Sequence, residues 1–203
     1  MNKLIELTEY DKRTIEFFNK MAPSWDENSS FDESKVRSVL SIAGISERVR
    51  ILDVACGTGV LIPCLLDKRP ECVVAIDISP AMAEIAHKKF SDPCLTILNV
   101  DFHWFDDDGF DLITLFNSYP HFPDRARFIQ HAYRLLNTGG RLLIFHDKSR
   151  DQINGRHKRN NDVKQVSTAL RPCHEEAIHF SGLFDVDVMA DTNHLYILSG
   201  TKR

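Results

Sequence analysis

The alternation of two kinds of short segment along the chain most constrains its fold. Runs rich in β-branched and other apolar residues occupy 49–55 and 72–78, and each is followed by a segment with the apolar spacing of a helix. Similar runs at 94–100, 110–116 and 141–146 continue the series, and the helix before the last run is expected to end at Gly139 and Gly140. This alternation predicts an α/β fold, a mostly parallel sheet between helices on both faces.

The C-terminal part of the chain changes this rhythm. A helix is expected near 172–182, and it precedes two strand-like runs at 184–191 and 194–200 that are close enough to pair antiparallel. The 203 residues contain no fixed-period repeat, low-complexity tract or Gly/Ser linker. We therefore predict one domain over 1–203, with an N-terminal helical cap at 1–44 and a Rossmann-like core at 45–203.

The amino-acid composition indicates which kind of partner and which cellular compartment to expect. The formal net charge is -4 and the basic residues are dispersed, which argues against a nucleic-acid binder and favours a small-molecule partner. Five cysteines without a CxxC pair indicate reduced thiols. The N-terminus is charged throughout, and no apolar run approaches the roughly 20 residues that span a bilayer. We expect a cytoplasmic protein with no membrane partner.

A glycine-containing loop follows the first strand, where parallel sheets bind ligands beyond their carboxyl ends. Gly57 and Gly59 allow backbone to approach a ligand at a helix N-terminus, as in dinucleotide-binding folds. The third glycine of that motif is replaced by Ile62, however, and Asp53 at the strand tip would repel a pyrophosphate. S-adenosylmethionine (SAM) carries an ammonium and a sulfonium and no phosphate, so Asp53 suits it. The alternative is a plain strand–helix turn.

An acidic residue ends the second strand at a matching distance. Asp77 lies 18 residues after Gly59, close to the spacing at which a carboxylate accepts hydrogen bonds from ribose hydroxyls. The alternative role for Asp77 is the N-cap of the helix that Pro80 begins, although Ser79 serves that role equally well.

The residues after the third strand suggest an adenine site. Asp101 is placed to accept a hydrogen bond from an exocyclic amine, and Phe102 or Met82 to pack on the ring. A solvated loop aspartate is the alternative for Asp101. Ile78 and Asn117 are also expected to contact the cofactor.

Four segments, DVACGTG, AIDISPAM, NVDF and LLNTGGRLLI, together resemble the class I SAM-dependent methyltransferase superfamily, over about residues 45–200. The resemblance implies a seven-stranded sheet with an antiparallel last strand, and it assigns the cofactor to Gly57, Gly59, Asp77 and Asp101. Ala55, which we include in the cofactor site, stands where the family more often has glycine. The segment FFNKMAPSWDE (17–27) resembles the N-terminal helix and cap of small bacterial members related to the ubiquinone/menaquinone methyltransferase group. That likeness implies a cover over the cofactor.

The loop after the fourth strand is expected to contact the methyl acceptor. Residues 116–123 (FNSYPHFP) lack the Asn-Pro-Pro-aromatic arrangement of methyltransferases that act on exocyclic or amide nitrogens, which argues against DNA bases and protein glutamine. An aromatic, proline-rich loop suits a preformed apolar pocket for a small acceptor. The prolines alternatively serve the shape of the loop alone.

Three histidines stand where this topology puts the acceptor, namely His121, His146 and His157. His146 or His121 is a candidate base that takes a proton from a hydroxyl, thiol or amine as it is methylated. The three imidazoles are alternatively metal ligands together with Asp147 or Asp124, although their spacing is not a recognised metal signature. The third interpretation is structural, with each ring bonded to a loop or facing solvent.

The polar segment 148–164 completes the acceptor side. It is interpreted as a lid in which Arg150 or Arg156 pairs with a carboxylate or phosphate on the acceptor, or as a solvated helix face. We predict a SAM-dependent enzyme that methylates a small molecule, as a monomer or homodimer. The alternatives are a NAD(P)-type oxidoreductase and a non-catalytic SAM-binding regulatory protein.

Overall fold

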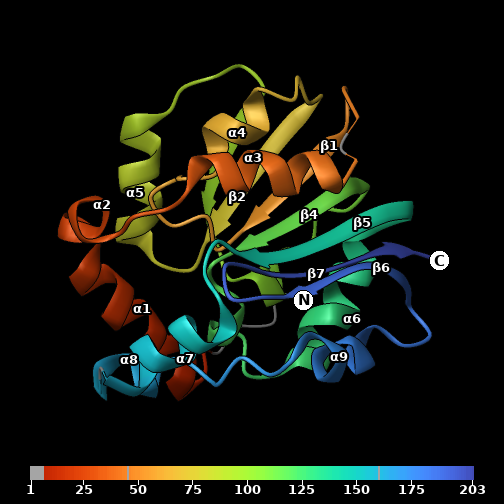
Figure 1. The fold of residues 1–203 in the computed structure, drawn as a ribbon. Helices are drawn as coiled ribbons and strands as arrows, with labels where there is room; N and C mark the ends of the chain where they lie inside the picture. The colour runs from red at the N-terminus through yellow and green to blue at the C-terminus, as the bar shows by residue number, and fades with distance from the viewer. Residues whose placement is uncertain (1–6, 45, 160) are drawn as a thin grey trace.

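One seven-stranded sheet runs through the computed structural model, which describes residues 7–44, 46–159 and 161–203 but not the side chains of residues 157 and 159. The strand order is β3-β2-β1-β4-β5-β7-β6 (Figure 1). β7 runs antiparallel to both of its neighbours, β5 and β6, and the other neighbouring pairs are parallel. The predicted mostly parallel sheet with an antiparallel last strand is therefore confirmed. The strands are β1 (Arg50–Val54), β2 (Cys72–Asp77), β3 (Leu95–Asn99), β4 (Phe110–Phe116), β5 (Leu136–His146), β6 (Phe184–Asp191) and β7 (Tyr196–Lys202).

The central strands are buried on both faces, which explains their unbroken apolar runs. Ile51 of β1 pairs with Val73 of β2 and Leu112 of β4, and all three side chains belong to one apolar cluster. Leu52, the next residue of β1, belongs to the cluster on the opposite face. The period of two along each strand thus feeds two separate cores.

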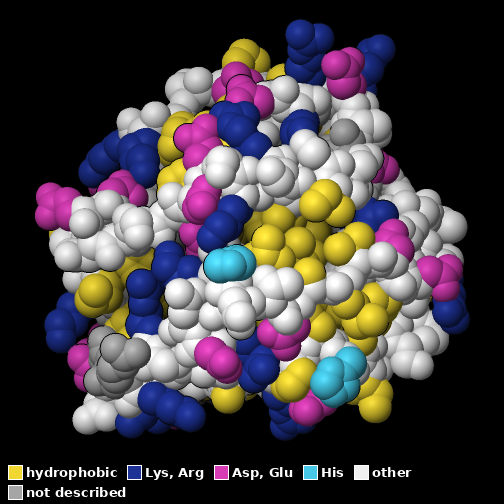
Figure 2. All heavy atoms as spheres, in the orientation of Figure 1, with side chains coloured by type: hydrophobic (Ala, Val, Ile, Leu, Met, Phe, Trp, Pro, Cys, Tyr) yellow, Lys and Arg dark blue, Asp and Glu magenta, His cyan; other side chains and the backbone are white. Residues whose placement is uncertain are grey.

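Helices cover the two faces unequally. On one face lie α3 (Glu33–Ile42), α4 (Ile62–Leu66) and α5 (Pro80–Lys89), and on the other lie α6 (Arg125–Leu135), α9 (Cys173–Glu176) and the 3₁₀ helix η4 (Ala177–Phe180) (Figure 1). The helix expected near 172–182 is therefore a short α-helix continued by a 3₁₀ turn. Figure 2 shows hydrophobic side chains gathered beside α3, over β5, β7 and β6, where no helix lies in front of the sheet. Val188, Ala190 and Leu195 contribute partly buried side chains to the cluster on this face.

The remaining helices lie beyond the carboxyl ends of the parallel strands. They are α1 (Glu9–Met21), the 3₁₀ helix η1 (Ala22–Ser24), α2 (Trp25–Asn28), α7 (Arg150–Arg159) and α8 (Asn161–Gln165) (Figure 1). α1 contacts the chain next to α8, because the Tyr10 hydroxyl of α1 donates to the Val166 carbonyl just after α8 at 2.7 Å. In the described residues, we find no helix with the length and apolar character that a membrane crossing requires.

The predicted end of the helix before the fifth strand is wrong. α6 ends at Leu135, and Gly139 and Gly140 lie inside β5. The pairing of β4 with β5 shifts register between Phe110 and Leu112, so the chain bulges there. Gly139 adopts a left-handed φ of 79°, and a Cβ on Gly140 would lie 2.9 Å from the Asn137 carbonyl oxygen. The glycine pair serves this bulge and not a helix terminus.

Candidate functional site

The loop between β1 and α4 requires unusual backbone conformations. Ala55, Gly57 and Gly59 have left-handed φ values of 54°, 57° and 89°. A Cβ on Gly59 would lie 2.6 Å from the ring of Phe90, so glycine is needed there for space as well as for conformation. The loop is thereby held tightly against the end of β2, where the Cys56 amide donates to the Ile76 carbonyl at 3.0 Å.

Asp77 connects this loop to the start of α5. Its two carboxylate oxygens accept hydrogen bonds from the Gly57 and Ser79 amides, both at 2.8 Å. Burial raises the pKa of Asp77 to about 6, although these two hydrogen bonds oppose the rise. The N-cap of α5 is Ser79, whose hydroxyl accepts from the Met82 amide at 3.2 Å. A carboxylate has about four acceptor sites, so Asp77 retains capacity for ligand hydroxyls.

Asp53 is a second buried carboxylate beside Asp77. It is 1% exposed, and one oxygen accepts from the Thr114 hydroxyl at 2.9 Å. The other oxygen, Oδ2, receives no hydrogen bond from the described residues. Burial, and then the negative charge of Asp77, raises the pKa of Asp53 to about 7. Two neighbouring acids without a basic partner in the described chain create a local demand for positive charge.

The residues after β3 form the next part of the site. Asp101 begins the 3₁₀ helix η2 (Phe102–Trp104) by accepting from the His103 amide at 2.8 Å, and burial raises its pKa. Phe102 and Met82 are 3% and 1% exposed. His103, which the sequence did not single out, lines the same cavity, and burial lowers its pKa to about 4. The sequence around His103 does not indicate that this side chain lines the cavity, because its position depends on the 3₁₀ turn that Asp101 caps.

One cavity of about 650 Å³ brings the predicted residues together. Gly59 does not line the cavity, but every other residue expected to contact the cofactor does. These residues are Asp53, Ala55, Gly57, Asp77, Ile78, Met82, Asp101, Phe102 and Asn117. His121 and His146 line it as well.

The segment from Thr8 to Phe31 forms one wall of this cavity, and we call it the N-terminal segment. Asn19 Oδ1 accepts from the Ser79 hydroxyl at 2.7 Å. Asp26 accepts from the Thr58 hydroxyl at 2.6 Å and from Lys89 at 2.8 Å. The segment is thus tied to the glycine loop and to α5, the helix that follows Asp77.

Of the three predicted acceptor-side histidines, His121 and His146 have described side chains. The Nδ1 of His121 lies 2.6 Å from the Val166 carbonyl oxygen, and because a carbonyl oxygen only accepts, Nδ1 carries a proton. His146 is 1% exposed at the end of β5, with its ring against Tyr196. His157 lies on α7, but its side chain is outside the described residues. Among the described side chains, no group of three His, Cys, Asp or Glu is arranged to hold a metal, and the three-histidine metal site stays an untested prediction.

A buried charged network supports the loop that carries His121. Glu176 and Arg125 form an ion pair at 3.6 Å, with side chains 2% and 7% exposed. Arg125 donates to the carbonyls of Tyr119 and Phe122, on either side of His121, and the Tyr119 hydroxyl donates to Glu176 at 3.2 Å. Sequence reasoning missed this network because Glu176 lies more than 50 residues from both Tyr119 and Arg125.

The segment at 148–164 contains α7 and most of α8, and it contacts the cavity. Gln152, Ile153 and Arg156 of α7 line the cavity, as helical spacing allows. Arg150 instead pairs with Asp191 at 2.9 Å. Within the described chain, Arg156 has no acidic partner, and the same is true of Arg127 of α6, which also lines the cavity.

The strand order, the antiparallel β7, the glycine loop after β1 and the acid at the end of β2 define a class I SAM-dependent methyltransferase domain. Residues 51–140 match the model of a family described as "Methyltransferase domain".

Similar curated proteins act in methyl transfer. The malonyl-[acyl-carrier protein] O-methyltransferase 1 of Ilyobacter polytropus is 29% identical over 137 residues, which cover 66% of this chain and 51% of that protein. The ubiquinone/menaquinone biosynthesis C-methyltransferase UbiE of Geotalea daltonii is 29% identical over 160 residues, covering 70% and 66%. This chain therefore spans between about half and two thirds of these relatives.

A solved structure described as a complex of DhpI with SAH, the demethylated product of SAM, shares the fold. Its TM-score is 0.74 at 16% identity, with 95% of this chain and 97% of that chain covered. The chain carries a class I SAM-dependent methyltransferase domain, and SAM is the cofactor of that class.

Proposed function

We propose that this chain transfers a methyl group from SAM to a small-molecule acceptor inside the 650 Å³ cavity. The pair of buried acids, Asp53 and Asp77, carries this proposal. Their raised pKa values show that the protein alone leaves both charges poorly compensated. A ligand with an ammonium and a sulfonium compensates them, whereas a pyrophosphate adds negative charge beside them, which disfavours a NAD(P)-type oxidoreductase.

The residues present fit SAM along the whole cavity. Gly57 and Ala55 would hold the amino-acid part with their backbone, and Asp77 would accept from the ribose hydroxyls. Asp101 would accept from the adenine amine. The apolar side chains of Ile78, Met82 and Phe102 would pack around the base, and Asn117, which follows β4, would lie toward the methyl-transfer end. When bound, SAM supplies an electrophilic methyl group on a sulfonium sulfur.

The chain's own residues supply enclosure and proton transfer. The N-terminal segment, within the proposed cap at 1–44, covers the cofactor and excludes water from the core at 45–203. His121 or His146 takes the proton that the acceptor loses as its nucleophilic atom bonds to carbon, and positioning supplies much of the remaining rate. The Val166 carbonyl keeps the His121 proton on Nδ1, which suits Nε2 to the role of base.

The distribution of charge in the cavity favours an anionic acceptor. Asp53, Asp77 and Asp101 line the cavity at the ends of β1, β2 and β3, on the cofactor side, and Asp11 and Asp124 line it as well. Lys148 and Arg156 lie on the opposite side, after β5, whereas Arg127 of α6 lies near Asp101 and His103. Because Lys148 already contacts Asp147 at 3.7 Å and Arg127 lies on the cofactor side, Arg156 is the group that binds a carboxylate or phosphate on the acceptor.

A methyl-transfer assay with labelled SAM tests the function directly. The protein should convert SAM to SAH only when an acceptor from a panel of phenols, thiols, amines and carboxylic acids is present. Replacement Asp77→Ala should abolish SAM binding, and His121→Ala or His146→Ala should lower turnover about 100-fold or more with little effect on SAM affinity. A protein that binds SAM but yields no methylated product from any acceptor would instead be a non-catalytic binder.

Arg156→Gln tests the acceptor class separately. It should raise the KM of an anionic acceptor about tenfold and leave a neutral analogue unaffected. Lys158→Gln is the matched control, because it removes the same charge from α7 at a position outside the cavity lining. Equal effects of the two variants would refute the role of Arg156. A cytoplasmic location and a monomeric or homodimeric state stay predictions from the sequence.

A further inference from the structure

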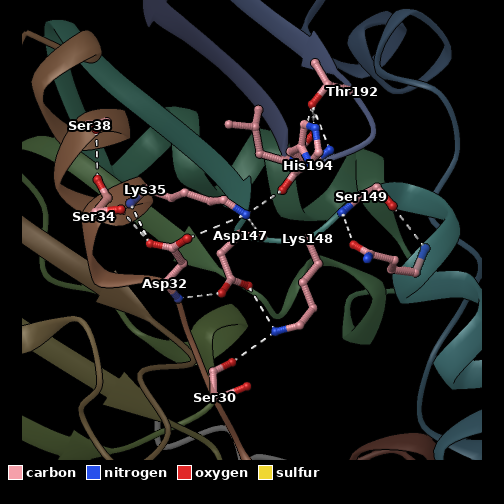
Figure 3. Close-up of polar contacts among 12 residues, drawn as sticks. Ser30, Asp32, Ser34, Lys35, Ser38, Asp147, Lys148, Ser149, Thr192 and His194 are labelled. Atoms are coloured by element: carbon pink, nitrogen blue, oxygen red, sulfur yellow. Dashed lines mark hydrogen bonds and ion pairs between the residues drawn. The ribbon is translucent and has the colours of Figure 1, made fainter.

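Asp147, the residue directly after β5, joins three separate parts of the site, and Figure 3 shows it beside Asp32, Lys35 and Lys148. It is 5% exposed, and both carboxylate oxygens accept hydrogen bonds. Oδ1 accepts from Asn117 Nδ2 at 3.0 Å, and Oδ2 accepts from the Asp32 backbone amide at 2.9 Å. The carboxylate therefore bridges the loop after β4 and the chain that leaves the N-terminal segment.

The contact with Asn117 is reciprocal. The Asp147 amide donates to Asn117 Oδ1 at 3.3 Å, so the two residues exchange hydrogen bonds across the ends of β4 and β5. Asn117 has a left-handed φ of 54°, a conformation that asparagine and aspartate tolerate better than most residues. The pairing with Asp147 holds this strained residue in place at the methyl-transfer end of the cavity.

The contact with Asp32 belongs to a set that fastens the end of the N-terminal segment. Lys148 donates to the Ser30 carbonyl at 3.0 Å, and Lys35 donates to the Asp147 carbonyl at 3.1 Å (Figure 3). Ser30 and Phe31 line the cavity, so these bonds hold its wall in the closed position. Movement of the wall away from the cavity would break the bond from Asp32 to Asp147.

We propose that Asp147 is a positioning residue that couples closure of the N-terminal segment to the placement of Asn117 at the methyl-transfer end. When the segment closes, the Asp32 amide and Asn117 are held by opposite oxygens of one carboxylate. When it opens to exchange the cofactor, the carboxylate loses one of the two bonds that fix its orientation, and Asn117 is held less firmly by the bonds that remain. The coupling rests on the proposed function for its consequence in catalysis, but the hydrogen-bond arrangement itself is testable without turnover.

An amide cannot replace this carboxylate. In Asp147→Asn, one oxygen becomes an NH₂ group, which must face either Asn117 Nδ2 or the Asp32 amide, so two donors meet. The exchange Asn117→Asp combined with Asp147→Asn restores a donor opposite an acceptor at both contacts. Asp111→Asn is a matched control, because Asp111 likewise bridges a backbone amide, that of Arg50 at 2.9 Å, and an asparagine, Asn137 at 2.8 Å, at the opposite end of β4.

The experiment measures the hydrogen-exchange rate of the Asp32 amide by NMR and the dissociation rate of SAH by stopped flow. Asp147→Asn should raise both rates about tenfold, and Asp111→Asn should change neither. The double exchange should restore the exchange rate of the Asp32 amide to within about threefold of wild type, and it is judged on that rate alone because Asn117 lines the cofactor cavity. Unchanged rates in Asp147→Asn, or a folded double exchange that does not restore the Asp32 exchange rate, would overturn the proposal. If Asp147→Asn does not fold, the Asp32 exchange rate of the double exchange decides alone. If wild-type protein binds no SAH, the proposed function fails, while the exchange rate of the Asp32 amide still decides the coupling.

Discussion

Replacement of Asp53 by asparagine should make the ligand-free protein more stable and its cofactor binding weaker. Burial raises the pKa of this carboxyl from 3.8 to about 7, so the folded state holds the proton more tightly than the unfolded state. Between about pH 4 and pH 7 the unfolded chain ionises while the folded chain does not, and stability falls as pH rises. A pKa rise of about 3, at about 1.4 kcal/mol for each pKa unit, corresponds to about 4 kcal/mol of stability lost by pH 8.

Asparagine does not ionise, so Asp53→Asn avoids this loss. Its amide can still accept from Thr114, but the NH₂ group at the unpartnered Oδ2 position costs about 1–3 kcal/mol. The variant should therefore be about 1–3 kcal/mol more stable than wild type at pH 8 and equally or less stable near pH 4. SAH should bind about 30-fold more weakly, because a charge pair some 6–10 Å apart at a dielectric of about 20 contributes about 2 kcal/mol.

Urea unfolding of ligand-free protein at pH 4.5 and pH 8, with calorimetric titration of SAH at pH 8, measures both effects. Asp108→Asn, at an exposed position, controls for loss of a negative charge. The reasoning is refuted if the stability difference between Asp53→Asn and wild type is the same at both pH values, or if the variant binds SAH as tightly as wild type.

Three further outcomes follow from the same contacts. Wild-type affinity for SAM should rise as pH increases through about 6 to 7, with protons released on binding, because the bound cation favours ionised Asp53 and Asp77; a pH-independent affinity would contradict this. Gly59→Ala should destabilise the protein by about 2–4 kcal/mol in urea unfolding, since its Cβ would meet the Phe90 ring; an unchanged midpoint would show that the loop yields. Glu176→Ala should cost about 3–5 kcal/mol by leaving Arg125 buried without its partner, and a loss below about 1 kcal/mol would contradict that network.

The sheet was predictable from sequence because its signal is local. Apolar runs of five to seven residues, each buried on both faces, mark strands such as β2 and β4 regardless of what packs on them. Asp77 could be located for the same reason, since it ends a strand at a set distance from Gly59. The error at Gly139 and Gly140 has the opposite origin. Glycines that end a helix and glycines that form a bulge look alike until the partner strand is known.

The acceptor side was less predictable because its contacts join distant parts of the chain. The bond from Asp32 to Asp147 spans 115 positions, and neither residue carries a motif. Arg150 and Arg156 looked equivalent in sequence, and only the position of Asp191 in β6 separates them. Side-chain periodicity reports which face of an element is buried, but it contains no information about which polar group lies opposite.

Calorimetric titration of the wild-type protein with SAH, and in parallel with NAD, tests the central claim most directly. We expect one SAH site per chain with a dissociation constant in the micromolar range or below, and no heat from NAD. Asp77→Ala should abolish SAH binding. Binding of NAD without binding of SAH would contradict it.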